Sequence, residues 1–110
     1  MSLFETWSAA FENRNADAAA ACLHDDFTFV RHQSGTTMNK AEMLEMFKGF
    51  LSNDSVVMHS QRCLYENAEI MVEHSVMDFP DGSREAIMSF NTLKDGQIVR
   101  TETGATPISK

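Results

Sequence analysis

Hydrophobic positions in the first half of the chain recur with helical spacing. Between residues 2 and 13 the apolar side chains are three or four positions apart, which predicts an amphipathic helix. These side chains are Leu3, Phe4, Trp7, Ala10 and Phe11. A short second helix is expected over Asp17–Leu23, with Asn15 as its cap. A third helix is expected to begin at Asn39, which Glu42 follows in a capping-box pattern.

Strand-like alternation appears once between these helices and dominates the second half. Phe27, Phe29 and Arg31 alternate with the residues between them, which predicts a strand, and residues 34–36 are expected to form a loop. Four further β-rich runs follow. They are Val56–Tyr65, Glu69–Phe79, Ser83–Leu93 and Gln97–Thr106.

Short turns separate the four runs. Asp81-Gly82 and Asp95-Gly96 are strong signals for two-residue hairpins, and Glu66-Asn67 is a weaker one. The expected order is helix, helix, strand, helix, then an antiparallel meander. This order predicts an α+β domain, in which a strongly curved antiparallel sheet has helices on one face.

Composition narrows the range of partners. The chain has 110 residues, 16 acidic and 9 basic, and its net charge of −7 argues against nucleic acid and against an anionic membrane surface. It has no apolar run of roughly 20 residues and no signal-peptide pattern at its start. We therefore expect a single domain over residues 1–110 in the cytoplasm. Cys22 and Cys63 lack the spacing of a disulfide framework or a zinc site.

Four segments resemble the nuclear transport factor 2-like superfamily, on its SnoaL-like and ketosteroid-isomerase-like side. They are Trp7–Phe11, Asn15–Asp17, Leu23–Phe27 and Asp95–Arg100. The resemblance implies a cone-shaped roll with a pocket between sheet and helices, and a dimer formed through the convex sheet face. It does not imply one activity, because members of this superfamily catalyse different reactions or none.

Ketosteroid isomerases use a tyrosine and an aspartate whose positions fall on Trp7 and Arg31 of this chain. Indole is only a weak donor and arginine cannot act as a base at neutral pH. The sequence therefore does not predict steroid isomerase activity.

Two-residue turns would fix which residues lie opposite one another in the meander. The resulting register predicts a polar row of His59, His74, Ser89 and Glu102 on one face, with Asn91 beside it. We expect this face to be concave. A bulge or a longer hairpin would instead place Thr101, Thr103 and Ala105 inside.

Three polar residues are candidates for catalysis: His74, His59 and Arg31. The histidines have the pKa range of a general base, and the arginine would hold an anionic group or pair with Glu102 or Asp78. The alternative for the histidines is that they are ordinary cross-strand residues, hydrogen-bonded to each other or to Ser89. His59, His74 and Glu102 also have metal-ligand chemistry, but their spacing carries no metal signature, and no metal or cofactor is predicted.

A small apolar ligand is expected in the cone, and the same residues would otherwise form an ordinary core. The expected ligand-binding residues are Trp7, Phe11, Phe27, Phe29, Phe47, Ser89 and Asn91. The opposite face, with Met71, Met77, Met88 and Phe90, is expected to form a homodimer. Two functions remain open: an isomerase, lyase or hydrolase acting on a largely apolar substrate with an anionic or carbonyl group, or a non-catalytic dimeric ligand-binding domain.

Overall fold

Three helices are present in the computed structural model, which describes residues 2–109. They are α1 (Leu3–Glu12), α2 (Ala16–Ala21) and α3 (Lys40–Leu51). Capping boxes begin α1 and α3, where Ser2 pairs with Glu5 and Asn39 with Glu42. These hydrogen bonds satisfy backbone N–H groups that have no partner inside the first turn. All three helices begin within one or two residues of the predicted positions.

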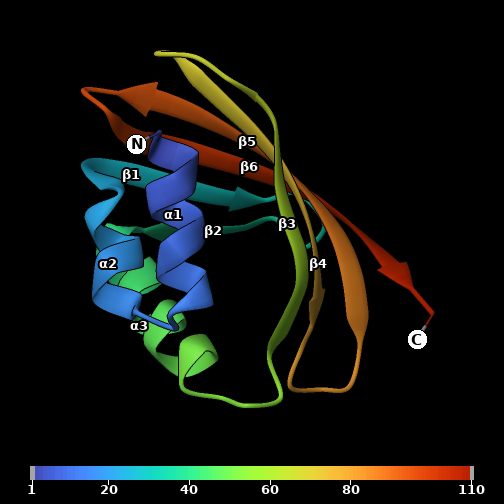
Figure 1. Cartoon of the computed structure of the whole chain (residues 1–110). Coiled ribbons are helices and arrows are strands. Elements are labelled where there is room, and N and C mark those ends of the chain that lie inside the picture. Colours follow the sequence, from blue (N-terminus) through green and yellow to red (C-terminus); the bar gives the residue numbers. More distant parts are fainter. Residues whose placement is uncertain (1, 110) are drawn as a thin grey trace.

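Six strands form one sheet in the order β2-β1-β6-β5-β4-β3. Their bounds are β1 (Leu23–Arg31), β2 (Thr36–Asn39), β3 (Val57–Glu66), β4 (Ile70–Asp78), β5 (Arg84–Lys94) and β6 (Gln97–Ile108). Neighbouring strands are antiparallel, except that β1 runs parallel to β6. The curled sheet wraps around the helices, which confirms the predicted α+β cone-shaped roll (Figure 1).

Strand β2 was not expected, because Thr36 was assigned to a loop. Residues Thr36–Asn39 pair with the end of β1, so the loop between these strands covers only residues 32–35. Short strands at a sheet edge carry a weak periodic signal, since few positions alternate.

The hairpin at Asp95-Gly96 has the predicted conformation. Its φ angles are 54° and 76°, the two positive values of a type I′ turn. A bulge follows, because the pairing moves by one residue between Leu93–Ile98 and Thr92–Arg100. Beyond this bulge, β6 turns Thr101 toward the concave face, which is the alternative that the sequence left open.

The connection from β4 to β5 is one residue longer than predicted. Among the residues around it only Gly82 has a positive φ, 87°, and the Phe79 N–H donates to the Ser83 carbonyl at 2.9 Å. The loop is therefore Pro80-Asp81-Gly82, a type I turn followed by a left-handed residue. The resulting register differs by one residue from the predicted one, so the two faces of β4 are exchanged relative to β5.

The connection from β3 to β4 also differs from the prediction. The last pair of this hairpin is Glu66–Met71, and the Asn67 side chain accepts from the N–H groups of Glu69 and Ile70. The turn therefore covers residues 67–70 and not Glu66-Asn67.

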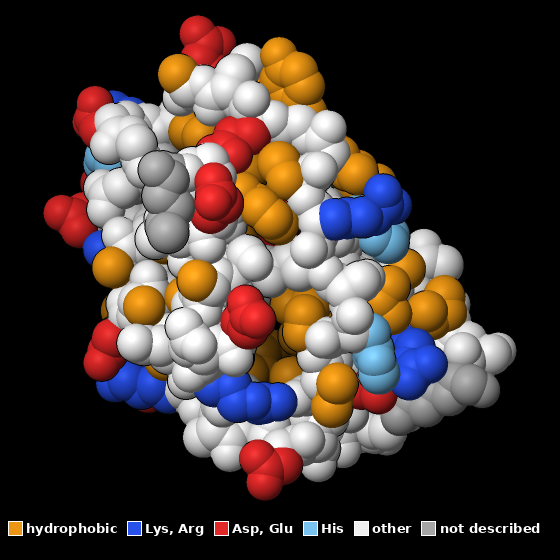
Figure 2. Space-filling model, in the orientation of Figure 1, with side chains coloured by type: hydrophobic (Ala, Val, Ile, Leu, Met, Phe, Trp, Pro, Cys, Tyr) orange, Lys and Arg blue, Asp and Glu red, His pale blue; other side chains and the backbone are white. Residues whose placement is uncertain are grey.

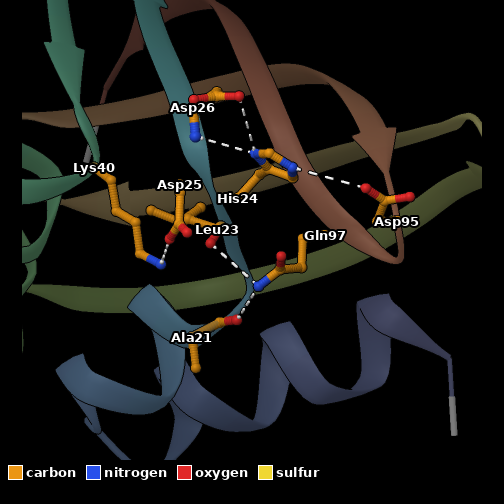
Figure 3. A network of polar contacts seen from close by, with 8 residues as sticks. All are labelled: Ala21, Leu23, His24, Asp25, Asp26, Lys40, Asp95 and Gln97. Atoms are coloured by element: carbon orange, nitrogen blue, oxygen red, sulfur yellow. Dashed lines mark hydrogen bonds and ion pairs between the residues drawn. The ribbon is translucent and has the colours of Figure 1, made fainter.

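Helices α1 and α3 pack against each other through aromatic side chains. Trp7 and Phe11 of α1 and Phe47 of α3 form three edge-to-face ring pairs with centroids 4.7–5.9 Å apart. The Gln97 amide donates to the carbonyl groups of Ala21 and Leu23 and so connects the start of β6 to the junction of α2 and β1 (Figure 3).

Candidate functional site

A cavity of about 210 Å³ lies between the helices and the concave face of the sheet. Figure 2 shows hydrophobic side chains inside the hollow between these two layers. The helical wall is apolar and consists of Trp7, Phe11, Met43, Met46, Phe47, Phe50 and Leu51. The sheet wall contributes most of the polar groups: Arg31, Gln61, Glu73, Ser75, Glu85, Ser89, Asn91, Thr101 and Thr103.

One row of polar residues crosses the sheet wall. Glu73 of β4 lies opposite Ser89 of β5, Ser89 opposite Thr103 of β6, and Thr103 beside Arg31 of β1. Neighbouring strands are about 4.8 Å apart, so the Cα atoms at the two ends of the row are separated by at most roughly 14 Å. The row therefore places one carboxylate and one guanidinium on the same cavity wall.

Glu73 is the most enclosed ionisable group of the cavity, with 5% of its surface exposed. Its Oε1 accepts hydrogen bonds from Trp7 Nε1 at 3.2 Å and from Gln61 Nε2 at 3.3 Å. Its Oε2 accepts from Asn91 Nδ2 at 2.9 Å. The Asn91 amide is fixed in turn, because its Nδ2 also donates to the Met71 carbonyl.

Burial raises the pKa of Glu73 above its ordinary value of 4.5. The hydrogen bonds from Gln61, Trp7 and Asn91 lower the pKa, but less than the loss of hydration raises it. A carboxyl group with a raised pKa in a cavity can hold or release a proton closer to neutral pH than an exposed one.

Three residues on the sheet wall carry hydroxyl groups that are not paired. Ser75, Ser89 and Thr103 are 6–9% exposed and line the cavity. Within residues 2–109 none of these hydroxyls has a hydrogen-bond partner. Their oxygen atoms remain accessible, because the buried unpaired side-chain nitrogen or oxygen among the described residues is His74 Nδ1. The three hydroxyls are therefore available to a molecule that occupies the cavity.

At the other end of the polar row, Arg31 is neutralised by Glu85. Its Nη2 lies 3.2 Å from Glu85 Oε1 and also donates to Gln33 Oε1 at 3.0 Å. The side chain of Glu85 is 10% exposed and that of Arg31 39%. The guanidinium therefore already has a partly buried countercharge, and it lies in the cavity wall as the sequence predicted.

The residues expected to bind the ligand all line the cavity. They are Trp7, Phe11, Phe27, Phe29, Phe47, Ser89 and Asn91. Their contact with a ligand remains a prediction.

The predicted position of His74 is wrong. It lies opposite Met88 of β5 and Arg62 of β3, on the convex face, while its neighbours Glu73 and Ser75 line the cavity. The cause is the longer loop before β5, because a shift of one residue exchanges the two faces of a strand. The predicted catalytic role of His74 inside the cone is therefore excluded.

His59 is also outside the cavity. Its Nε2 lies 2.9 Å from Asp78 Oδ2, and Arg84 binds the same carboxylate through its Nε at 2.7 Å. His59 was predicted to lie opposite His74, but His74 pairs with Arg62, because the turn between β3 and β4 comes later in the chain than predicted. No cluster of three or more metal-ligating side chains occurs in the described part of the chain.

Glu73 was not predicted as a residue of the site, although the sequence carries a local signal for its position. In the predicted register Pro80 would flank a two-residue turn opposite Ser83. Proline cannot donate a hydrogen bond there and favours the second position of a type I turn instead. A proline directly before Asp-Gly therefore indicates the three-residue loop that turns Glu73 inward.

Of the four residues expected on the dimer face, only Met88 and Phe90 lie on the convex face of the sheet. Met88 and Phe90 are 45% and 42% exposed on it, together with Leu64 at 43%. Met71 is fully buried and Met77 lines the cavity, so neither belongs to this face.

Comparison with known proteins agrees with this architecture. Residues 4–101 match the SnoaL-like domain family, and the chain belongs to this family. No curated protein matches the chain. Its fold is similar to that of three solved structures, and at these identities the similarity concerns the fold alone.

The first is an NTF-2 like protein of unknown function from Burkholderia xenovorans LB400, with 13% identity, TM-score 0.78, and 98% and 83% of the two chains covered. The second is an NTF2-like protein of unknown function from Cytophaga hutchinsonii ATCC 33406, with 16% identity, TM-score 0.73, and 94% and 87% covered. The third is a steroid delta-isomerase from Pseudomonas aeruginosa, with 16% identity, TM-score 0.72, and 96% and 78% covered. No helix in residues 2–109 is long and apolar enough to cross a membrane.

Proposed function

We propose that the cavity binds a small, largely apolar molecule and that Glu73 exchanges a proton with the polar group of this molecule. The observation that carries the proposal is a nearly inaccessible carboxyl group with a raised pKa on the wall of a largely apolar cavity. Proton transfer of this kind is the chemical step shared by isomerases, lyases and many hydrolases.

The polar group of the substrate is not expected to be anionic. Arg31 is the one arginine among the cavity-lining residues, and Glu85 already balances its charge. A second anion next to Glu85 would be repelled. The unpaired hydroxyls of Ser89 and Thr103 can instead donate to a carbonyl oxygen while Glu73 takes a proton from the adjacent carbon.

Proton exchange on a simple ketone tests the catalytic part of the proposal. Cyclohexanone in deuterated buffer would be followed by proton NMR for deuterium uptake next to its carbonyl group. Wild-type protein should accelerate the uptake, and Glu73→Gln should reduce it to the rate in buffer. Glu45→Gln is a matched control, because it removes the same charge from an exposed site on α3.

The alternative is a non-catalytic ligand-binding domain, favoured by the three donors that already occupy Glu73. Binding of cyclohexanone without accelerated exchange would support this alternative and contradict the catalytic role.

We also propose a homodimer formed through the convex face. Exposed Met88, Phe90 and Leu64 form an apolar surface there, which is unusual for a sheet face in contact with water. Arg84, Asp78 and His59 supply polar groups beside this surface.

A further inference from the structure

We infer that the cavity selects a positively charged ligand, an ammonium group on a compact apolar body, and that this ammonium binds next to Glu73. The inference rests on the ligand site proposed above in its non-catalytic form, because a ligand whose ammonium group occupies the last free acceptor position of Glu73 is bound there and is not deprotonated at carbon. It follows from the balance of charges inside the cavity, from the orientation of the groups around Glu73, and from the chemistry of the neighbouring hydroxyls.

The charges that line the cavity do not cancel. They are Glu73, Glu85 and Arg31. Arg31 and Glu85 form an ion pair with their atoms 3.2 Å apart, whereas the partners of Glu73 are an indole and two amides, all of them neutral. Within residues 2–109 no Lys, Arg or His nitrogen forms an ion pair with Glu73. With Glu73 ionised, the cavity therefore carries one negative charge that no lining residue balances.

The groups around Glu73 are arranged for the carboxylate ion. Trp7 can only donate, so the Glu73 oxygen facing it must accept. Asn91 is oriented independently, because its Nδ2 faces the Met71 carbonyl and its Oδ1 accepts from the Thr101 hydroxyl at 2.6 Å. Both carboxyl oxygens of Glu73 are thus surrounded by donors whose orientation does not depend on it.

An ionised carboxylate buried without a countercharge is unfavourable, even when neutral donors surround it. A carboxylate offers about four acceptor positions, and three are used here, so one remains for a ligand. An ammonium group has three donors. One can bind Glu73, and the Ser89 hydroxyl, which lies opposite Glu73 in the sheet and has no partner within residues 2–109, can accept another.

The apolar body is limited by the volume of the cavity. An engineered cavity of about 150 Å³ holds benzene, and the present one is about 210 Å³, which allows one ring with a short arm. Trp7, Phe11 and Phe47 line this space and form an aromatic wall against which such a ring can pack.

Three probes of nearly equal size test the sign of the charge: benzylamine, benzyl alcohol and benzoate. Their affinities for the purified protein would be measured by isothermal titration calorimetry at about pH 8, where an alkylamine is still protonated. The other titratable groups facing Glu73 are Cys63 on β3, Arg31 on β1 and Glu85 on β5. Burial raises the pKa of the Cys63 thiol, so it remains uncharged in this experiment.

Benzylamine should bind at least about tenfold more tightly than benzyl alcohol, and benzoate should bind most weakly. Glu73→Gln should remove the preference for benzylamine and leave the affinity for benzyl alcohol within about twofold. Glu45→Gln should change neither affinity, because this residue is exposed on α3.

Three outcomes would each overturn the inference and leave the proposed ligand site in place. They are a preference for benzoate, equal affinities of benzylamine and benzyl alcohol, and a preference for benzylamine that survives Glu73→Gln. If none of the three probes binds, both the inference and the proposed ligand site are overturned. If Glu73→Gln does not fold, the comparison of the probes on wild-type protein decides, supported by proton release when benzylamine binds near the pKa of Glu73.

Discussion

The indole N–H of Trp7 donates a hydrogen bond of 3.2 Å to the carboxyl group of Glu73, across 66 positions of the chain. Through this contact α1 is connected to β4 inside the cavity, where both side chains are less than 10% exposed. The bond links a property of the site, the ionisation of Glu73, to a property of the fold, the position of the first helix. Trp7 therefore acts as a positioning residue for Glu73.

Trp7→Phe should lower the stability of the protein and raise the pKa of Glu73. The variant keeps an aromatic ring but removes a donor to a buried carboxyl group, a loss that typically costs about 1.5–3 kcal/mol. Chemical denaturation should show a free energy of unfolding lower by at least this amount, and NMR titration should show a Glu73 pKa higher than in wild type. An unchanged pKa would contradict the role of the indole.

Stability should fall as pH rises above 4.5 because of Glu73. Its pKa is raised in the folded state, so between 4.5 and the folded pKa the folded chain binds more protons than the unfolded chain. The free energy of unfolding is therefore highest below this window and decreases through it. In Glu73→Gln this decrease should be absent when thermal unfolding is followed from acid to neutral pH, and a decrease of the same size in the variant would show that another group is responsible.

The contribution of Asp78 to stability should depend on pH in the opposite direction. Hydrogen bonds from Arg84 and then His59 hold its pKa well below its ordinary value of 3.8. The stabilisation is therefore present above 3.8 and is lost as pH falls through the folded pKa. Asp78→Asn should be less stable than wild type at neutral pH, and the two proteins should converge in acid. The measurement is denaturant unfolding at a series of pH values, and a constant difference would contradict the ion pair.

Gly82→Ala should destabilise the hairpin between β4 and β5. The φ angle of Gly82 is 87°, which alanine rarely adopts, although no atom lies within 4 Å of the added methyl group. The expected loss is about 1 kcal/mol from the backbone alone. Gly49→Ala is the matched control, since Gly49 lies inside α3 with equally open space and should gain stability by about 0.5–1 kcal/mol. Equal effects of the two substitutions would contradict this account.

A charge on the convex face should disrupt the proposed dimer. Met88→Lys with Phe90→Lys places two positive charges on a surface where these side chains are now 45% and 42% exposed. Light scattering at micromolar concentration should give a dimer for wild type and a monomer for the variant, with unchanged far-ultraviolet circular dichroism. A wild-type monomer would contradict the dimer directly.

Local patterns in the sequence determined the helices, their caps and one hairpin. The pairs Asn39–Glu42 and Asp95-Gly96 form structures that depend on a few adjacent residues, and both have the predicted conformation. The helical spacing of Trp7 and Phe11 likewise placed both side chains on the buried side of α1. The family and the curved α+β architecture could also be predicted, because they depend on the order of elements and not on the register of any strand.

The register of the sheet was decided by the tertiary structure, apart from the local signal that Pro80 gives for the longer loop before β5. Side chains in a strand alternate with a period of two, so the one additional residue in the Pro80-Asp81-Gly82 loop exchanged Glu73 for His74 inside the cavity. The bulge in β6 brought Thr101 inward to hold Asn91, and through it Glu73. The buried carboxyl group and its donors come from three consecutive strands and from α1, which is 66 positions away, and such a site exists only when strand register and helix packing bring them together.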